Sequence, residues 1–187
     1  METLTKEKET SFQENHSVHG LRDLFEIGLK EMYYSEKALG KILPKMLKNA
    51  TTPELIETLK NHLAENKKQI ARLEVIFKTN FIEVNAQKCE AMNGLLKETI
   101  ELLKNTDVGT VRDAGIISSE QKMKHYEIAT YGTLRAFANI LGNKKTANLL
   151  AKTLNEDKKA DKALSKIAMY SINQHAYNAN AITTVFM

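Results

Sequence analysis

Apolar residues recur in this chain at alternating spacings of four and three positions. The first run consists of Phe25, Leu29, Met32, Leu39, Leu43 and Met46, with Glu36 at the one charged position of the series. An α-helix turns once in about 3.6 residues, so this spacing places all seven on one face, as in the seam of a helical bundle. The same spacing returns from Ile116 to Leu141, and helical patterns also run from Pro53 to about Phe77 and from Ala147 to Ala168. The sequence therefore predicts an all-α fold with four long helices.

The connections predict how the helices are arranged. Thr52 and Pro53 suit a helix start directly after the first helix, and Gly142–Asn143 divides the third from the fourth. Short connections make each pair an antiparallel hairpin. The second and third helices are more than thirty residues apart, and the segment between them includes a pattern for a short helix from Glu90 to Lys104. Two hairpins joined by one long crossover form a ferritin-like four-helix bundle, which we assign to residues 18–172 between an N-terminal flexible tail, 1–17, and a C-terminal tail, 173–187.

Composition limits the classes of partner. The net charge is +4, but the lysines alternate with glutamates along helix faces and the arginines do not cluster, so we expect no binding to nucleic acid. No apolar run reaches the length of a membrane span, and no membrane association is expected. Cys89 is the one cysteine, which rules out an internal disulfide and favours a cytoplasmic location.

Two carboxylates interrupt the apolar seam of the third helix. Glu120 and Glu127 lie two helical turns apart among residues that otherwise resemble a core. A buried carboxylate is costly unless it is paired, protonated or bound to a metal. Glu120 could neutralise a lysine or line an entrance to the interior.

The two hairpins match at a constant offset of 91 residues. This offset pairs Glu36 with Glu127 and Glu65 with Glu156, and several apolar residues match as well. Glu36 and Glu65 lie 14 and 15 residues from Ala50 at the first turn, so they reach nearly the same height at about 1.5 Å per residue. The repeat therefore predicts four carboxylates near the middle of the bundle. Because they would repel one another, we expect two divalent ions, iron or manganese, to bind there.

The pattern departs from the usual carboxylate-bridged site. That site takes Glu-x-x-His from two of its helices, but Lys68 follows Glu65 and Lys159 follows Glu156 at the histidine positions. A protonated lysine is a poor ligand, and its charge opposes metal loading.

Other residues could complete the set of ligands. His62, one turn before Glu65, either binds metal or forms a hydrogen bond at the edge of the bundle. Asp157 and Asp161 fit the seam of the fourth helix better than Glu156, so either could replace it as the ligand.

Three segments resemble the bacterial YciE/YciF stress-protein family. They are YYSEKALGKILPKM, CEAMNGLL and VRDAGIISSEQKMKHYEIATYGTLRAFA, and the resemblance covers roughly residues 20–170. It implies a ferritin-like four-helix bundle that is dimeric, cytoplasmic and linked to bacterial stress responses.

Two functions follow as alternatives. In the first, the chain is a ferritin-like metal-binding protein that handles iron, manganese, oxygen or peroxide. In the second, it is a metal-free homodimeric scaffold induced by stress, with its carboxylates paired to lysines such as Lys68 and Lys159. Metal content distinguishes the two.

Overall fold

The computed structural model describes residues 18–185, with side chains as far as residue 179. The predicted flexible tail, 1–17, lies outside these residues. The described elements are α1 (Leu21–Asn49), α2 (Pro53–Thr79), α3 (Glu90–Asn105), α4 (Thr110–Ile140), α5 (Lys144–Ile167), a π-helical turn η1 (Ala168–Ile172) and α6 (Asn173–Val185). No strand occurs within residues 18–185, so the prediction of an all-α fold is confirmed. None of the helices in this range is both long and apolar enough to cross a membrane.

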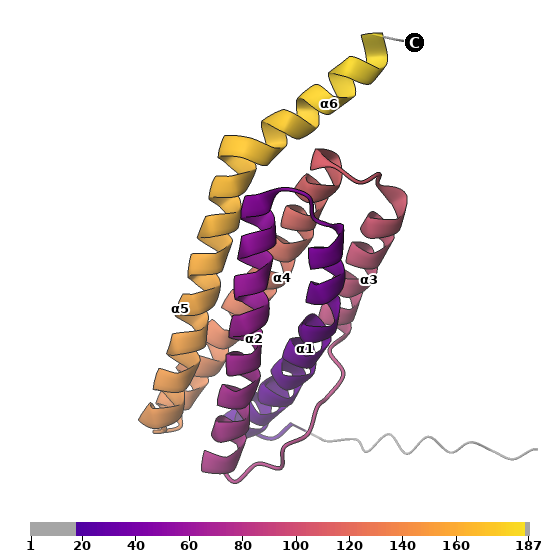
Figure 1. The fold of residues 1–187 in the computed structure, drawn as a ribbon. Helices are drawn as coiled ribbons and strands as arrows, with labels where there is room; N and C mark the ends of the chain where they lie inside the picture. The colour runs from indigo at the N-terminus through magenta and orange to yellow at the C-terminus, as the bar shows by residue number, and fades with distance from the viewer. Residues whose placement is uncertain (1–17, 186–187) are drawn as a thin grey trace, which may run out of the picture.

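Four helices form the bundle and a fifth lies beside it (Figure 1). Both α1 and α5 pack against α2 and α4, and the α1–α2 and α4–α5 connections are tight turns at opposite ends of the bundle. After α2 the chain returns along the bundle through an extended segment and α3, which packs against α1 and α4. This is the predicted arrangement of two hairpins and one long crossover.

The apolar core is divided into two clusters. One cluster, near the α4–α5 turn, includes Phe25, Leu29 and Phe77. The other, near the α1–α2 turn, includes Leu43, Leu59 and Leu164. The fully buried polar side chains described below lie between the two clusters in sequence along each helix, except Glu120, which lies among α4 residues of the second cluster. A layer of charge therefore crosses the middle of the bundle.

The segment predicted as a C-terminal tail is helical in its described part. From Asn173 to Val185 the backbone is helical, and α6 extends beyond the bundle from the end of α5, at an angle to that helix (Figure 1). Its contacts with the bundle are made to α4. The assignment of residues 173–187 as a tail outside the bundle remains a prediction.

The start of α2 is held by a side chain from another helix. Thr52 occupies the N-cap position before Pro53, as predicted, but its hydroxyl forms no cap within its own helix. Instead Asp113, in the first turn of α4, accepts hydrogen bonds from the backbone N–H groups of Thr51 and Thr52 at 2.9 and 2.8 Å and from both hydroxyls at 2.7 and 2.6 Å. The buried carboxylate thereby joins the α1–α2 turn to α4.

Replacing Asp113 with alanine should lower the free energy of unfolding by about 2–4 kcal/mol, because the donors of Thr51 and Thr52 lose a charged acceptor. Urea denaturation followed by circular dichroism measures the change. Asp107→Ala, at an exposed position in the α3–α4 connection, is the control and should change stability by less than about 0.5 kcal/mol. Equal effects of the two substitutions would contradict the capping role of Asp113.

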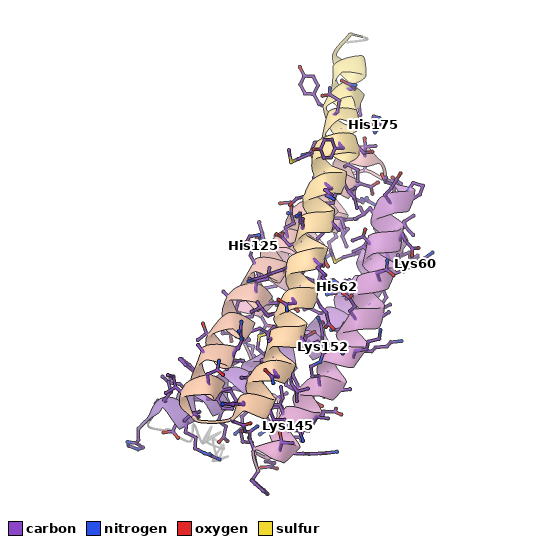
Figure 2. The ribbon with its side chains drawn as sticks, turned by 90° about the vertical axis from the view of Figure 1, so that its left-hand side faces the viewer. Lys60, His62, His125, Lys145, Lys152 and His175 are labelled. Carbon is purple, nitrogen blue, oxygen red and sulfur yellow. The ribbon has the colours of Figure 1, made fainter. Side chains whose placement is uncertain are left out.

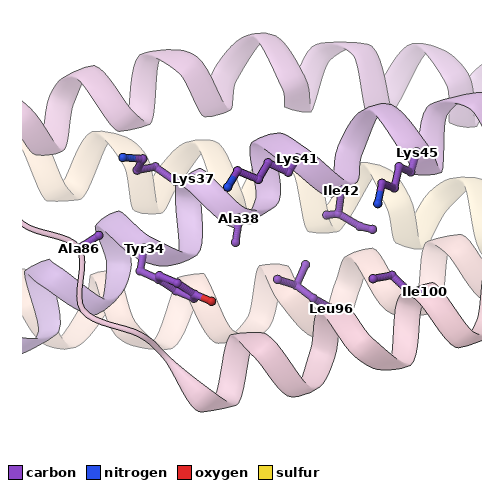
Figure 3. Close-up of a pocket in the computed structure, with 9 residues that line it drawn as sticks. All are labelled: Tyr34, Lys37, Ala38, Lys41, Ile42, Lys45, Ala86, Leu96 and Ile100. Atoms are coloured by element: carbon purple, nitrogen blue, oxygen red, sulfur yellow. The ribbon is translucent and has the colours of Figure 1, made fainter. Parts of the chain in front are cut away.

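A surface groove lies between α1 and α3 (Figure 3). Its volume is about 420 Å³, its apolar wall includes Ile42, Leu96 and Ile100, and three exposed lysines of α1 border it: Lys37, Lys41 and Lys45. No carboxylate, histidine or cysteine lines this groove within the described part of the chain. It therefore lacks the carboxylate, imidazole and thiolate groups that most often bind transition metals.

Candidate functional site

A layer of buried polar side chains crosses the middle of the bundle. We call it the polar layer; its members are Glu36 from α1, His62, Asn66 and Gln69 from α2, Glu120, Lys124 and Glu127 from α4, and Asp157 from α5. Each is at most 2% exposed. Groups this deeply buried need partners of opposite charge or hydrogen bonds to offset the loss of water.

Lys124 is the positive centre of the polar layer. Its Nζ lies 2.9 Å from Asp157 Oδ1 and 2.9 Å from Glu127 Oε2. Burial disfavours the ammonium, but the charges of Glu127, Asp157, Glu120 and Glu36 outweigh burial and raise the pKa of Lys124 above its usual value. The side chain is therefore a fixed positive charge inside the bundle.

Glu36 is held mainly by neutral donors. The Tyr131 hydroxyl donates to Oε1 at 2.6 Å, and Asn66 Nδ2 donates to Oε2 at 2.7 Å and to the Glu36 carbonyl at 2.9 Å. A Cβ at Gly40 would lie 2.9 Å from Asn66 Oδ1, so glycine there lets Asn66 approach α1. Burial is the main cause that raises the pKa of Glu36 to about 7, against the opposing effects of Lys124 and these donors.

Glu127 is more strongly perturbed. Burial raises its pKa to about 8, and the nearby charges of Asp157 and Glu36 act in the same direction, although Lys124 opposes them. Near neutral pH the polar layer can therefore hold protons on Glu36 and Glu127, while Asp157 faces the Lys124 ammonium.

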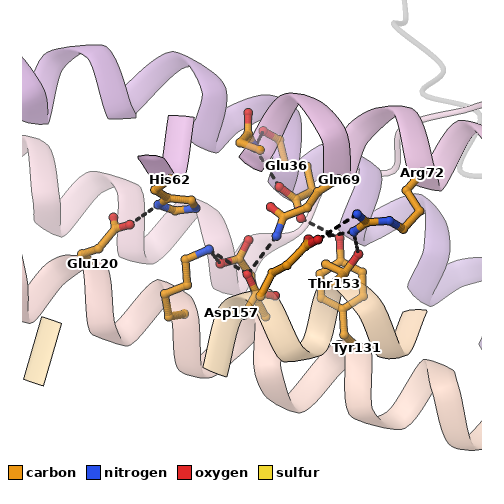
Figure 4. Close-up of polar contacts among 12 residues, drawn as sticks. Glu36, His62, Gln69, Arg72, Glu120, Tyr131, Thr153 and Asp157 are labelled. Carbon is orange, nitrogen blue, oxygen red and sulfur yellow. Dashed lines mark hydrogen bonds and ion pairs between the residues drawn. The ribbon is translucent and has the colours of Figure 1, made fainter. Parts of the chain in front are cut away.

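His62 and Glu120 form a hydrogen-bonded pair between α2 and α4 (Figure 4). His62 Nδ1 contacts Glu120 Oε1, which fixes the orientation of the ring. Burial opposes ionisation of Glu120, but His62 and Lys124 together lower the pKa of this carboxyl below its usual value. With the proton on Nδ1, His62 Nε2 carries a free electron pair.

Six buried atoms of the polar layer have no hydrogen-bond partner in the described structure: His62 Nε2, Gln69 Oε1, Glu120 Oε2, Glu127 Oε1, Glu127 Oε2 and Asp157 Oδ2. Glu127 Oε2 has the Lys124 ammonium at 2.9 Å, but as an ion pair without hydrogen-bond alignment. All six are electron-pair donors when His62 carries its proton on Nδ1. Their chemistry fits a hard divalent cation.

The donors are not arranged around a common point. Among the described residues, no group of three or more His, Cys, Asp and Glu side chains is placed to hold a metal ion. Glu127 and Asp157 instead converge on Lys124, so binding of a metal requires these side chains to turn.

The structure brings together four of the residues predicted as ligands: Glu36, His62, Glu127 and Asp157. Figure 2 shows His62 partway along the bundle. The burial of Glu36 and Glu127 agrees with the offset of 91 residues. The same offset relates Asn66 to Asp157, so it is these two positions that face the polar layer.

The other three predicted ligands lie outside the polar layer. Arg72 binds Glu156 through two hydrogen bonds of 2.8 and 2.9 Å, and Glu65 is only half-buried. Asp161 accepts a hydrogen bond from Gln121 at 3.0 Å and faces the largely exposed His125 at 3.3 Å. As the side chains stand, none of the three contacts the central carboxylates.

The lysine at the centre is not one that the sequence analysis singled out. Lys68 and Lys159 are both exposed. Lys124 reaches the carboxylates instead, and its spacing could have revealed it, because it follows Glu120 by four residues and precedes Glu127 by three. Positions at these spacings share one helix face.

Comparisons with known proteins agree with the fold. Residues 20–177 match the family model described as Domain of unknown function (DUF892). The chain is 37% identical to Protein YciF of Escherichia coli (strain K12) over 159 residues, which is 84% of this chain and 96% of that protein.

Solved structures are similar over the same range. The crystal structure of the E. coli stress protein YciF gives a TM-score of 0.80 at 36% identity, covering 83% of this chain and 99% of that one. YcfI from Rhodopseudomonas palustris gives 0.79 at 39% identity, with the same coverage. A protein from Xanthomonas campestris pv. campestris gives 0.68 at 17% identity over 86% of this chain and 98% of that one, which bears on the fold alone.

Proposed function

The chain belongs to the DUF892 family of YciF-like stress proteins, and from that premise we propose that its bundle binds divalent iron or manganese in the polar layer. The observation that supports this most is the set of unpartnered electron-pair donors inside the bundle. Carboxylate and amide oxygens together with an imidazole suit these two metals.

His62, Glu127 and Asp157 are the residues that we expect to hold metal. The hydrogen bond from His62 to Glu120 orients the ring in the way that carboxylates orient metal-binding histidines elsewhere. Glu36 and Gln69 lie in the same layer and supply further oxygens. When bound, iron or manganese would supply redox chemistry, which makes oxygen or peroxide the substrate class to test.

The raised pKa values of two carboxylates also fit metal binding. Because the pKa values of Glu36 and Glu127 are about 7 and 8, protons neutralise part of their charge near neutral pH. A divalent ion offers the same neutralisation, so its binding should release protons and strengthen as the pH rises.

Lys124 favours a second candidate function. Because its ammonium already neutralises part of the charge of Glu127 and Asp157, the bundle could be stable without metal and act as a scaffold for a protein partner. In this alternative, Lys124 takes the role that the sequence assigned to Lys68 and Lys159.

Metal content of the purified protein separates the two functions. The protein is purified from cells grown with iron and manganese, and metal per chain is measured by inductively coupled plasma mass spectrometry. We expect near-stoichiometric metal in the wild type and at least a roughly tenfold loss in the isosteric double variant Glu127→Gln, Asp157→Asn.

The matched control is Glu65→Gln, Glu156→Gln. It removes the same number of carboxylates at positions adjacent to the polar layer and should keep its metal. A folded wild type without metal, even after incubation with Fe(II) or Mn(II), would support the scaffold instead.

For the whole molecule we propose a homodimer in the cytoplasm. The single cysteine, Cys89, suits a reducing compartment, and the dimer is an expectation from the family resemblance. Size-exclusion chromatography with light scattering measures the mass directly, and a value near the 21.1 kDa of one chain would reject the dimer.

A further inference from the structure

We infer that the Lys124 ammonium takes the place of one of the two cations expected in a ferritin-like site, so that the polar layer binds a single divalent ion. This inference rests on the proposed metal binding and specifies its stoichiometry. It follows from which carboxylate oxygens the ammonium contacts and from a difference between the two hairpins.

The ammonium contacts one oxygen of each carboxylate in the second hairpin and leaves Glu127 Oε1 and Asp157 Oδ2 for the remaining ion. Lys124 Nζ is 2.9 Å from one oxygen of Glu127 on α4 and 2.9 Å from one oxygen of Asp157 on α5. All three side chains are at most 1% exposed, so water does not compete with these contacts. Because the ammonium is attached to α4, it cannot leave the site as a free cation could.

The first hairpin has no equivalent cation. The residue 91 positions before Lys124 is Tyr33, whose hydroxyl donates to Glu74 at 2.9 Å outside the polar layer. Asn66 stands where the second hairpin has Asp157 and donates to Glu36. The two halves therefore differ in how they balance charge: one uses neutral donors and the other uses a built-in ammonium.

The ammonium also changes the charge balance of the polar layer. The polar layer contains four carboxylates, Glu36, Glu120, Glu127 and Asp157, and the Lys124 ammonium. With His62 neutral and all four carboxylates ionised, the ammonium and one divalent ion leave the layer a net charge of −1, and the ammonium and two ions leave it at +1. The two cases differ because the second ion would lie beside the ammonium in a dry layer and be repelled by it. Without the ammonium, two divalent ions would balance the four carboxylates.

The test counts bound Mn(II) in the wild type, in Lys124→Met and in Lys122→Met. Lys122 is an exposed lysine two residues away on α4, so its substitution controls for the loss of a lysine from this helix. Each protein is stripped with a chelator and reloaded with Mn(II). Equilibrium dialysis gives ions per chain, and electron paramagnetic resonance distinguishes isolated from exchange-coupled Mn(II).

We expect one uncoupled Mn(II) per chain in the wild type and in Lys122→Met, and two coupled ions in Lys124→Met. Two ions in the wild type, or one in a folded Lys124→Met, would overturn the inference and leave the proposed metal binding intact. Mn(II) in Lys124→Met alone would also overturn it, because the ammonium would then exclude both ions. If no variant binds Mn(II), the proposed function itself fails. Should Lys124→Met not fold without metal, the wild-type count still decides whether the capacity is one or two.

Discussion

Substitution of Lys124 by methionine is expected to lower the free energy of unfolding of the metal-free protein by about 3–5 kcal/mol at pH 8. The substitution keeps most of the side-chain volume but removes the positive charge from Glu127 and Asp157, whose oxygens lie 2.9 Å from Nζ. Removing one partner of a buried ion pair leaves the remaining charge without water or a counter-ion. The loss should shrink at pH 5.5, where protons can neutralise these carboxylates.

Urea denaturation in the presence of a chelator measures this effect. Lys122→Met is the control: Lys122 is more than half exposed and pairs with Glu98 on the surface, so its loss should change stability by less than about 1 kcal/mol. Metal bound to the folded state adds to its stability. Added Mn(II) should therefore stabilise Lys124→Met more than the wild type, because we expect the variant to bind two ions and the wild type to bind one. Equal stability of Lys124→Met and Lys122→Met in chelator would show that the ammonium is dispensable.

The metal-free wild type should lose stability as the pH rises from 5.5 to 8. Burial raises the pKa of Glu36 from 4.5 to about 7 and that of Glu127 from 4.5 to about 8. In this interval the folded chain binds more protons than the unfolded chain, so the free energy of unfolding falls as the pH increases. The expected loss is roughly 3 kcal/mol or more. Glu120, whose pKa is lowered, contributes its pH dependence below this interval.

Glu127→Gln tests the origin of this slope. Glutamine resembles the protonated acid, so the variant should lose less stability between pH 5.5 and 8 and should exceed the wild type at pH 8. Denaturation curves in chelator at three pH values are sufficient. Glu65→Gln, outside the polar layer, is the control and should keep the wild-type slope. A wild type whose stability is constant or rises over this interval would contradict the raised pKa values.

The fold could be predicted from local patterns. The alternating spacing of four and three residues gives long helices because it matches the period of the α-helix. Short turns and one long connection leave few ways to arrange them, and the structure agrees from Leu21 to Ile167. The helix from Asn173 to Val185 was missed, because its sequence is rich in Asn and Ala and does not carry the alternating spacing of four and three residues.

The candidate site could be predicted only in part. The offset of 91 residues predicted that Glu36 and Glu127 face inward, and both are buried. The same offset also placed Glu65 and Glu156 at the centre, but both lie outside the polar layer, because a step of one residue along a helix turns the side chain by about 100°. Asp157 therefore lies in the polar layer, where Lys124 donates to it, whereas the neighbouring Glu156 points away and binds Arg72.

By itself the sequence determined the helices, their pairing and the height of two central carboxylates, since helical period and connection length act along the chain. The tertiary structure decided which cation meets those carboxylates and which side chain holds the start of α2. Lys124 reaches Asp157 on α5, and Asp113 reaches Thr51 and Thr52 in the α1–α2 turn. Contacts of this kind depend on the rotation of each helix about its axis against its neighbours, which packing fixes and local spacing does not.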